Sequence, residues 1–468
     1  MPRFTPNRRQ ALGLLGAGAA AALAPIGARV ASAQAHVPLD IQATRYPILD
    51  RPTSGLFSTR PGAPPPVLRL KQHEAFAADV TNLTDAYTTM HWHGIRLPNE
   101  MDGVPYLTQF PIAKGETFSY RFASPDAGTF WYHPHCMTME QMAQGLTGLL
   151  IVEEADDPGF DADIPLNLKD FRLNDAGEWL DLWTPRGAAR GGTFGTVITT
   201  NWEVAPTYAA PAGGLVRLRI GATDTTRVYR LFLPGAAGQV IALDGHPLDR
   251  PEPIPQVEED ALLLGPGQRA DIAIRVPSEE GATLPLMARV PGGSRALAVI
   301  RAEGADAGRD LAELRPLSPN PVAIPDLANA RREEFVFGWS PDDMLPNNGL
   351  CGSLGYTFWS INRTPWPGDA AETAGPLATL RLGESVVLRL RNESPNDHPI
   401  HLHGLIFRPI ASNKRAVRPH WTDTALLLRE ETMDVAFVAD NPGDWAFHCH
   451  VIEHQKTGLA GYIRVEEG

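Results

Sequence analysis

The sequence predicts an all-β protein made of three consecutive β-sandwich domains, and three observations support this prediction. Gly and Pro number 43 each among 468 residues, which is above ordinary usage and indicates many tight turns. Residues 117–122 and 386–391 alternate apolar and polar side chains with a period of two, as half-buried strands do. Similar segments also recur near the beginning, middle and end of the chain.

The recurring segments indicate where the domains lie. Residues 80–95 align without a gap with residues 390–405, and each copy contains a His-x-His-Gly motif. A middle copy, which includes residues 216–221, has the same strand pattern but no His-x-His pair. Self-similarity of this kind is typical of repeated structural units. The expected sandwiches are residues 36–157, 158–318 and 319–468.

The charge balance excludes two classes of partner. Lys and Arg number 41 against 54 Asp and Glu, which gives a net charge of −13. The first 33 residues carry four arginines and no acid, so their removal would take the charge from −13 to −17. We therefore expect no binding to a nucleic-acid backbone or to an anionic membrane.

The N-terminus, residues 1–33, resembles a twin-arginine signal peptide. Arg8 and Arg9 precede a weakly apolar run of Ala, Gly and Leu, and residues 31–33 form an A-x-A cleavage site. We expect export to the periplasm by the twin-arginine route, and the alternative is a basic terminus followed by an Ala-rich helix. No later segment reaches the ~18 consecutive apolar residues of a membrane span, so we expect no membrane insertion of the mature chain.

Histidine is the residue type that carries the functional signal. Of 14 histidines, ten lie in four clusters, and four pairs among them have the spacing His-x-His. On a strand, residues i and i+2 point to the same face, so four pairs offer eight imidazoles. A single pair is more often structural, but four pairs in two matched repeats predict a metal cluster between the first and last domains. The clustered residues are His91, His93, His133, His135, His398, His401, His403, His448, His450 and His454. The remaining four, His36, His73, His246 and His420, have no companions and are expected to be ordinary.

A second metal site is predicted around Cys449, which lies between His448 and His450 and points to the opposite face of its strand. His454 follows five residues later, and His398 comes from a neighbouring strand. This His₂Cys set, with Leu459 at the weak axial position, is that of a blue-copper electron-transfer centre, although zinc also binds such ligands. In the first repeat, Thr88 and Pro134 stand at the positions of His398 and Cys449, so only the last domain can build the second site.

The four motifs, residues 91–94, 131–135, 398–404 and 448–454, resemble those of the three-domain multicopper oxidases. The resemblance implies cupredoxin-like Greek-key β-sandwiches and four copper ions. It implies one-electron oxidation of a substrate at a type 1 copper, electron transfer through Cys449, and reduction of O₂ to water at a trinuclear cluster. By the same resemblance, the type 1 ligands are His398, Cys449 and His454; the type 2 ligands are His91 and His401; and the two type 3 sets are His93, His133 and His450, and His135, His403 and His448.

The resemblance also predicts how three further residues influence the copper sites. Leu459 offers no sulfur donor, which predicts a comparatively high type 1 potential. Asp102 resembles the acidic residue beside the type 2 copper and is a candidate catalytic residue with Cys449, whereas its alternative role is a turn Asp before Gly. Gln455 stands where bacterial relatives often carry a Glu, and an amide supplies no acidic proton. We therefore expect Asp102 to carry more of the proton delivery.

The expected substrates are phenols and aromatic amines, and the alternative is a cuprous oxidase. The last domain has only Met344 and Met433 and no Met-rich insertion that would collect Cu(I). The cluster of Cys136, Met137, Met139 and Met142 is either a copper-loading path or core filling. The candidate residues of the donor pocket, which are alternatively strand-packing residues, are Phe358, Trp359, Trp366 and Asp397.

Two rival classes fit the sequence less well. A copperless structural protein of the cell-division type would lack the ligand set that is complete here. A copper nitrite reductase would lack the paired type 3 ligands. We expect a monomer, and we expect Cys136 and Cys351 to be free thiols because folding before export takes place in a reducing compartment. A bond between these two cysteines is the alternative.

Overall fold

The computed structural model describes residues 36–341, 349–369 and 374–467. The predicted signal peptide, residues 1–33, and Met344 lie outside the described residues. Among the described residues, no helix combines the length and the apolar character needed to cross a bilayer.

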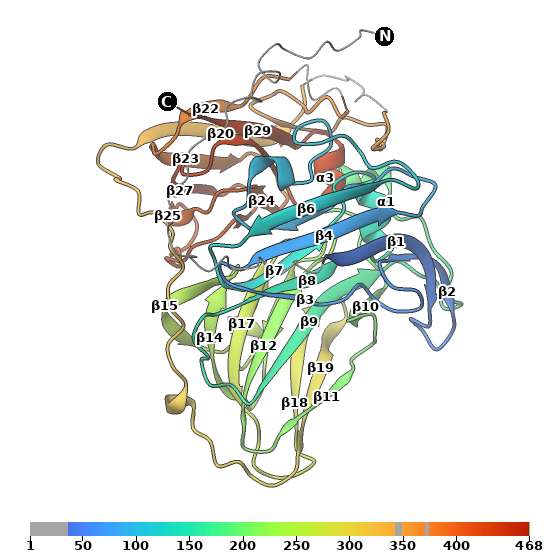
Figure 1. Ribbon diagram of the computed structural model, residues 1–468, viewed down its shortest axis with the longest axis vertical. Helices are drawn as coiled ribbons and strands as arrows, with labels where there is room; N and C mark the ends of the chain where they lie inside the picture. Colours follow the sequence, from blue (N-terminus) through green and yellow to red (C-terminus); the bar gives the residue numbers. More distant parts are fainter. Residues whose placement is uncertain (1–35, 342–348, 370–373, 468) are drawn as a thin grey trace, which may run out of the picture. The chain divides into compact units, whose positions relative to one another are not determined.

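The described chain is almost entirely β, and its strands form six sheets (Figure 1). Residues 37–153 supply two four-stranded sheets, ordered β2-β1-β4-β6 and β3-β8-β7-β5. Their strands are β1 (Val37–Tyr46), β2 (Thr53–Ser58), β3 (Leu68–Lys71), β4 (Ala75–Asn82), β5 (His91–His93), β6 (Thr117–Ala123), β7 (Gly128–His133) and β8 (Gly148–Glu153).

Residues 162–303 supply the next two sheets, ordered β10-β9-β12-β17-β14-β15 and β11-β19-β18-β13-β16. Their strands are β9 (Ala162–Phe171), β10 (Val197–Thr200), β11 (Thr207–Pro211), β12 (Leu215–Ala222), β13 (Tyr229–Phe232), β14 (Ala237–Leu243), β15 (His246–Pro253), β16 (Leu262–Leu264), β17 (Arg269–Arg275), β18 (Thr283–Val290) and β19 (Gly293–Glu303).

Residues 331–466 supply the last two sheets, ordered β21-β20-β23-β27-β25 and β22-β29-β28-β24-β26. Their strands are β20 (Arg331–Trp339), β21 (Trp359–Ile361), β22 (Ala378–Arg381), β23 (Ser385–Asn392), β24 (His398–Leu402), β25 (Arg408–Ser412), β26 (Thr424–Leu427), β27 (Thr432–Val438), β28 (Gly443–Cys449) and β29 (Ala460–Glu466). The short helices are α1 (Thr138–Ala143), α2 (Pro185–Ala188), α3 (Ile452–Lys456), η1 (Asn99–Met101), η2 (Glu258–Asp260) and η3 (Leu311–Glu313).

The strand pairing repeats three times along the chain. The parallel pairs β1·β4, β9·β12 and β20·β23 occupy the same place in each set. Each is followed by an antiparallel neighbour, namely β6, β17 and β27. This repetition agrees with the internal repeat in the sequence, while the domain boundaries at residues 157 and 318 stay a prediction.

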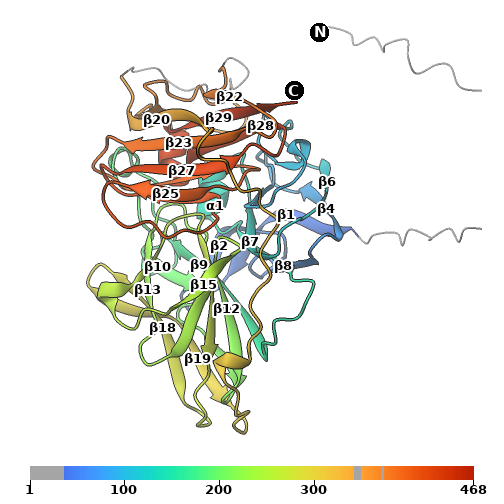
Figure 2. The ribbon, with the colours of Figure 1, turned by 90° about the vertical axis from the view of Figure 1, so that its left-hand side faces the viewer.

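The buried apolar side chains explain which sets of sheets meet. Residues of the first and last sets, from Leu39 to Val152 and from Phe335 to Val465, belong to one continuous cluster. The middle set has a core of its own, from Ile164 to Ala302. Figures 1 and 2 show the blue-to-cyan strands of the first set close to the orange-to-red strands of the last. The His-x-His pairs of the two copies are thereby brought together.

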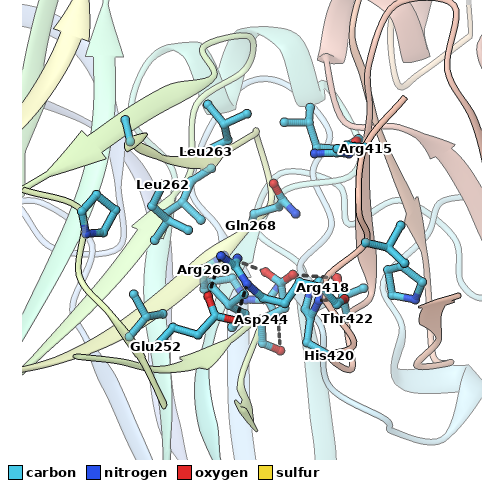
Figure 3. Close-up of a pocket in the computed structure, with 18 of the residues that line it drawn as sticks. Asp244, Glu252, Leu262, Leu263, Gln268, Arg269, Arg415, Arg418, His420 and Thr422 are labelled. Atoms are coloured by element: carbon cyan, nitrogen blue, oxygen red, sulfur yellow. Dashed lines mark hydrogen bonds and ion pairs between the residues drawn. The ribbon is translucent and has the colours of Figure 1, made fainter. Parts of the chain in front are cut away.

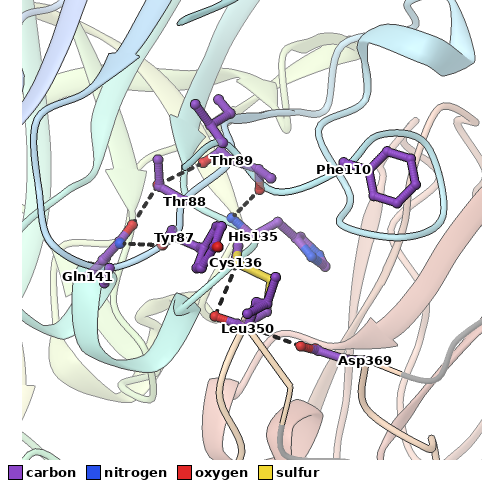
Figure 4. The surroundings of a disulfide bond; sticks show 12 residues. Tyr87, Thr88, Thr89, Phe110, His135, Cys136, Gln141, Leu350 and Asp369 are labelled. Atoms are coloured by element: carbon purple, nitrogen blue, oxygen red, sulfur yellow. Dashed lines mark hydrogen bonds between the residues drawn. A yellow bond between two sulfur atoms is a disulfide. The ribbon is translucent and has the colours of Figure 1, made fainter. Parts of the chain in front are cut away.

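The prediction of free thiols at Cys136 and Cys351 is wrong, because the two residues form a disulfide with a Cα–Cα separation of 4.5 Å (Figure 4). They are 215 residues apart in sequence. The redox state of the folding compartment does not determine which thiols the packing of distant segments brings within bonding distance. Cys449 is buried and is the free cysteine of the described residues.

Candidate metal centre

Strand register places the histidine pairs side by side. In the first copy β5 pairs with β7, so that His91 lies opposite His133. In the last copy β24 pairs with β28, so that His401 lies opposite His448 and Ile400 lies opposite Cys449. Because side chains alternate along a strand, Cys449 leaves the sheet on the face opposite to its two histidine neighbours.

Eight imidazoles form a buried cluster between the first and last copies. Within each group of three, the potential ligand atoms lie within 4.8 Å of one another. Every group contains residues from both copies, so neither copy alone completes a site. The groups are His91, His93 and His401; His93, His133 and His450; and His135, His403 and His448.

The ring nitrogens of this cluster fit a metal site. The Nδ1 atoms of His91, His133 and His448 donate hydrogen bonds to backbone carbonyl oxygens, which fixes each ring and leaves Nε2 free. Other ring nitrogens, among them His93 Nε2 and His403 Nδ1, face carboxylates. The rest lie buried without a partner or face another imidazole, as His403 Nε2 does at 3.0 Å from His448 Nε2. Buried polar atoms without partners are rare in proteins, and a metal ion would satisfy them. The partnerless nitrogens are Nε2 of His91, His133 and His401, Nδ1 of His93, and both nitrogens of His450.

The protonation of these groups also suits a cation. Burial lowers the pKa of His448 to about 3 and that of His454 to about 4. The rings are therefore neutral near pH 7, which is the form that binds metals. Burial raises the pKa of the Cys449 thiol, so a thiolate at this position needs a neighbouring cation.

The second predicted site is a compact His₂Cys group. Cys449 Sγ lies 3.5 Å from His398 Nδ1 and 3.5 Å from His454 Nδ1. The opposite ring nitrogens have protein partners, since His398 Nε2 lies 2.8 Å from the Ser394 hydroxyl and His454 Nε2 donates to the Arg190 carbonyl oxygen. The two Nδ1 atoms and the sulfur thus converge on one point, which fits a single metal ion.

Leu459 lies next to this group. Its N–H donates to the His454 carbonyl oxygen, and its own carbonyl oxygen accepts from the Cys449 N–H at 3.0 Å. The Leu459 side chain is fully buried. Trp359 packs against both histidine rings, with centroid separations of 5.1 Å to His398 and 4.7 Å to His454.

Asp102 contacts the histidine cluster through its carboxylate. Its Oδ2 accepts from His403 Nδ1 at 2.9 Å, and its Oδ1 lies 3.2 Å from His91 Nδ1. Gly103 follows with φ of 78°, and a Cβ there would lie 1.9 Å from the Met90 carbonyl oxygen. The glycine therefore permits the backbone turn that directs Asp102 toward the two histidines. Asp102 is thus both a turn residue before glycine and a residue of the metal site.

Asp423 is a site residue that sequence reasoning missed. Its carboxylate lies 2.9 Å from His93 Nε2, and its carbonyl oxygen accepts from His401 Nδ1. Arg269, from the middle copy, donates to this carboxylate at 2.6 Å. Burial acts to raise the pKa of Asp423, but the Arg269 guanidinium and the His93 ring hold it well below its usual range. The sequence had no signal for this role, because Asp423 precedes β26 and reaches the cluster only through sheet pairing.

The middle copy, which has no His-x-His pair, thus supports the centre from one side. Gly267 has φ of 93°, and a Cβ there would lie 3.0 Å from His93 Cε1. A cavity of about 570 Å³ lies beside Asp244 and Arg269 and is also lined by Arg418 and His420 (Figure 3). Asp244 Oδ2 accepts from Thr422 in this region, so one network joins the middle copy to Asp423.

Three of the four histidines that stand outside the clusters have hydrogen-bond partners for their side chains in the protein. His36 contacts Asp79, His246 contacts Asn320, and His420 donates to the Arg418 carbonyl oxygen. Among the described residues, neither these three histidines nor His73 belongs to a candidate metal group.

A cavity of about 650 Å³ lies beside the His₂Cys group, and its walls include Phe194, Asp397, Arg429 and Val451. The candidate pocket residue Asp397 therefore lines a cavity. Trp359 packs on the histidine rings instead, and Phe358 stacks on Tyr356. Trp366 lines a different cavity, which lies against His135 and His448.

An all-β frame that gathers eight imidazoles between its first and last copies, with a His₂Cys group beside them, is typical of a copper-dependent oxidoreductase. The multicopper oxidase family models match residues 41–157 and 351–468. The chain belongs to the multicopper oxidase family, and the cupredoxin-like fold class predicted from the sequence is confirmed.

Three relatives illustrate the similarity. Multicopper oxidase MmcO of Mycobacterium tuberculosis is 31% identical over 445 residues, which is 88% of this chain and 83% of that protein. The crystal structure of a multi-copper oxidase from Pseudomonas thermotolerans is 39% identical with a TM-score of 0.82, and the match covers 93% of this chain and 100% of that one. The laccase-like multi-copper oxidase CueO from the lignin-degrading bacterium Ochrobactrum sp. is 26% identical with a TM-score of 0.76, over 92% of this chain and 97% of that one.

Proposed function

We propose that this oxidase holds four copper ions and couples one-electron oxidation of phenols and aromatic amines to four-electron reduction of O₂ to water. The observation that carries the proposal is the direct linkage of the two metal groups. Cys449, in the His₂Cys group, is bonded through the backbone to His448 and His450, whose rings belong to the cluster of eight. When bound, copper ions would supply reversible one-electron redox chemistry at the first group and an O₂-binding centre at the second.

The residues of the chain divide this work. His398, Cys449 and His454 would hold the type 1 ion. His91 and His401 would hold the type 2 ion, and the backbone carbonyl oxygens of Asp102 and Asp423 orient these rings by accepting from their Nδ1 atoms. The two type 3 ions would be held by His93, His133 and His450, and by His135, His403 and His448. Burial of the eight rings limits access of water and limits escape of partly reduced oxygen.

The cavity beside the His₂Cys group supports an organic electron donor. Phe194 and Val451 offer apolar contacts for an aromatic ring, and Asp397 offers an acceptor for a phenol or an amine. Val451, in the cavity wall, donates its N–H to Cys449 Sγ at 3.4 Å, and Asp397 directly precedes His398, so the cavity adjoins the His₂Cys group. The Ochrobactrum relative is described as having oxidase activity towards lignin model compounds, which agrees with this class of donor.

The alternative, a cuprous oxidase, finds less support. Met139 and Met142 are fully buried in an apolar cluster with Trp131 and Ile452, and Cys136 is engaged in the disulfide. The cluster after His135 therefore fills core space. Met433, in the last domain, is also buried. Near the segment that follows His135, the half-buried Met137 is therefore the thioether that Cu(I) could reach.

A comparison of donors tests the substrate class. We expect a higher kcat/KM for 2,6-dimethoxyphenol than for Cu(I), with no requirement for added Cu(II). The Met137→Leu variant, which removes the thioether sulfur, is expected to leave both rates within about twofold, as for a volume-conserving exchange. Faster turnover of Cu(I), lost in Met137→Leu, would favour the cuprous oxidase instead.

We also propose export to the periplasm by the twin-arginine route, on the basis of Arg8, Arg9 and the A-x-A site at residues 31–33. Replacing both arginines with lysine should leave the protein in the cytoplasm, and fractionation of cells measures this. Unchanged periplasmic yield would contradict the proposal.

Leu459→Met is expected to lower the type 1 reduction potential by an amount on the order of tens of millivolts, because a thioether near the axial position stabilises Cu(II) relative to Cu(I). A redox titration of the copper-loaded protein followed by visible absorption measures the change. Leu459→Ile is the matched control, since it changes shape without adding sulfur. A potential that stays the same or rises in Leu459→Met would contradict the role given to this residue.

A further inference from the structure

Reduction of O₂ to two waters consumes four protons, and the eight imidazoles that would surround the reaction are buried. Gln455, directly after His454, has an amide side chain that cannot supply an acidic proton. Some other acidic group must therefore connect the cluster with solvent. The inference below rests on the proposed function.

One cavity reaches the cluster at the edge formed by His135 and His448. Its volume is about 70 Å³, which leaves room for a few water molecules at roughly 10–15 Å³ each. Gln455, Lys456 and Asp369 contribute polar groups to its wall. Asp369 is the carboxylate among the residues that line it.

Gln455 shows that this cavity suits water. Its Nε2 lies 3.3 Å from His135 Nε2, whereas its buried Oε1 has no hydrogen-bond partner in the protein. A buried amide oxygen without a partner costs free energy, and water in the adjoining cavity would satisfy it. A water chain along this wall would thus end beside the His135 ring.

Asp369 is held at the cavity by backbone contacts around the disulfide. Its Oδ2 accepts from the Cys351 N–H at 2.8 Å, and the Cys351 carbonyl oxygen accepts from Lys456 Nζ at 2.9 Å. The disulfide joins Cys351 to Cys136, the residue after His135. Figure 4 shows Asp369, the disulfide and His135 in the same region. Asp369 is half-buried, so it can exchange protons with both solvent and cavity.

We propose that Asp369 is the proton-delivery residue for O₂ reduction in this protein, in place of Asp102, for which the sequence predicts this role. Its carboxyl group donates a proton to water in the cavity, and this water passes a proton on toward the His135 and His448 edge. The carboxylate left behind is reprotonated from bulk solvent. Four such transfers accompany four electrons from the organic donor, so that O₂ becomes two waters and Asp369 is unchanged.

The surroundings of Asp369 support a proton-holding role. Burial raises the pKa of Asp369, while the Cys351 N–H and the Lys456 ammonium act to lower it. Tyr106 also faces the group, and burial together with Asp369 raises the pKa of Tyr106. A carboxyl with a raised pKa donates and recovers protons closer to neutral pH than an exposed one does.

Asp102 and Asp369 have different relations to the cluster. Asp102 accepts from two ring nitrogens and is buried, with 1% of its surface exposed, which suits orientation of His91 and His403. Asp369 touches no candidate ligand among the contacts described and opens to a cavity. The two residues are therefore separable by mutation.

The test uses the copper-loaded full chain in two half-reactions. Reduced protein is mixed with O₂ over a range of pH, and oxidised protein is mixed with a phenol without O₂. Asp369→Asn is expected to slow reoxidation by about 100-fold near neutral pH, the lower end of the loss typical of a general acid, with reduction by the phenol within about twofold of the unchanged protein. Asp369→Glu should recover most of the rate, and Gln455→Glu added to Asp369→Asn should bypass the loss.

Two further readouts separate proton delivery from a structural role. Copper content should be unchanged in Asp369→Asn, and the infrared carboxyl band that titrates in the copper-free protein should disappear. Asp85→Asn, which changes an exposed carboxylate, is the matched control. Reoxidation of Asp369→Asn at the original rate and pH dependence would overturn the inference, as would an equal loss in Asp369→Glu. A protein that loads copper but reduces no O₂ before any mutation would instead overturn the proposed function.

Discussion

Cys449→Ser is expected to abolish the intense visible absorption of a copper–thiolate site and to lower turnover by more than about 100-fold. Loss of a residue that only hydrogen-bonds to a metal ligand costs up to about 100-fold in metal affinity or activity. Cys449 supplies a ligand atom itself, because its Sγ lies 3.5 Å from the Nδ1 atoms of His398 and His454. Serine retains the volume of the side chain but replaces a soft donor with a hard one. The fully buried position offers no other sulfur ligand from a cysteine, because Cys136 and Cys351 are bonded to each other.

Absorption spectra and steady-state rates of the copper-loaded variant measure both effects. Cys351→Ala is the matched control, because it removes a sulfur atom and the disulfide while leaving the His₂Cys group intact. It should retain the copper–thiolate absorption. An unaltered spectrum in Cys449→Ser would show that the thiolate ligand is a different group.

Asp102→Asn is the variant with the second large expected effect, a roughly 10-fold to 100-fold slower reaction of the reduced protein with O₂. The carboxylate accepts from His403 Nδ1 and faces His91 Nδ1. An asparagine replaces one carboxylate oxygen with an N–H donor. That donor either removes the acceptor of His403 Nδ1 or points at the N–H of His91 Nδ1, which itself donates to the Asp102 carbonyl oxygen. Reduction of the type 1 site by a phenol should be nearly unchanged, because Asp102 touches no residue of the His₂Cys group.

Stopped-flow measurement of each half-reaction separates the rate of reaction with O₂ from the rate of reduction by the phenol. Glu100→Gln, which neutralises an exposed acid two residues earlier, serves as the control and should match the unchanged protein. Equal losses in both half-reactions would contradict the assignment of Asp102 to the O₂-reducing centre.

The sequence predicts the parts of the site that obey a local rule. A His-x-His pair presents both rings on one face because of strand periodicity, and the repeat between residues 80–95 and 390–405 indicates that two such copies exist. The alternation around Cys449 separates the thiolate from the cluster in the same way. These rules need no knowledge of how the sheets pack.

The parts that the sequence did not predict depend on packing between distant segments. Asp423 meets His93 across the interface of the first and last copies, and Arg269 comes from the middle copy, whose missing histidines suggested no role in the site. Cys136 and Cys351 meet only because residues far apart in the chain fold onto α1. Trp359 resembles a pocket residue in sequence but fills the space against the histidine rings, since its indole N–H donates to the Ala188 carbonyl oxygen.

We propose that ten imidazoles and one thiolate hold four copper ions in two connected centres. The most direct test reconstitutes the copper-free protein with Cu(I) under anaerobic conditions, removes unbound metal, oxidises the protein and combines metal analysis with electron paramagnetic resonance. We predict four copper ions per chain, with one copper–thiolate signal, one ordinary Cu(II) signal and two ions that are silent as a coupled pair. A chain that holds a single copper ion, or that retains zinc in preference to copper, would contradict the claim.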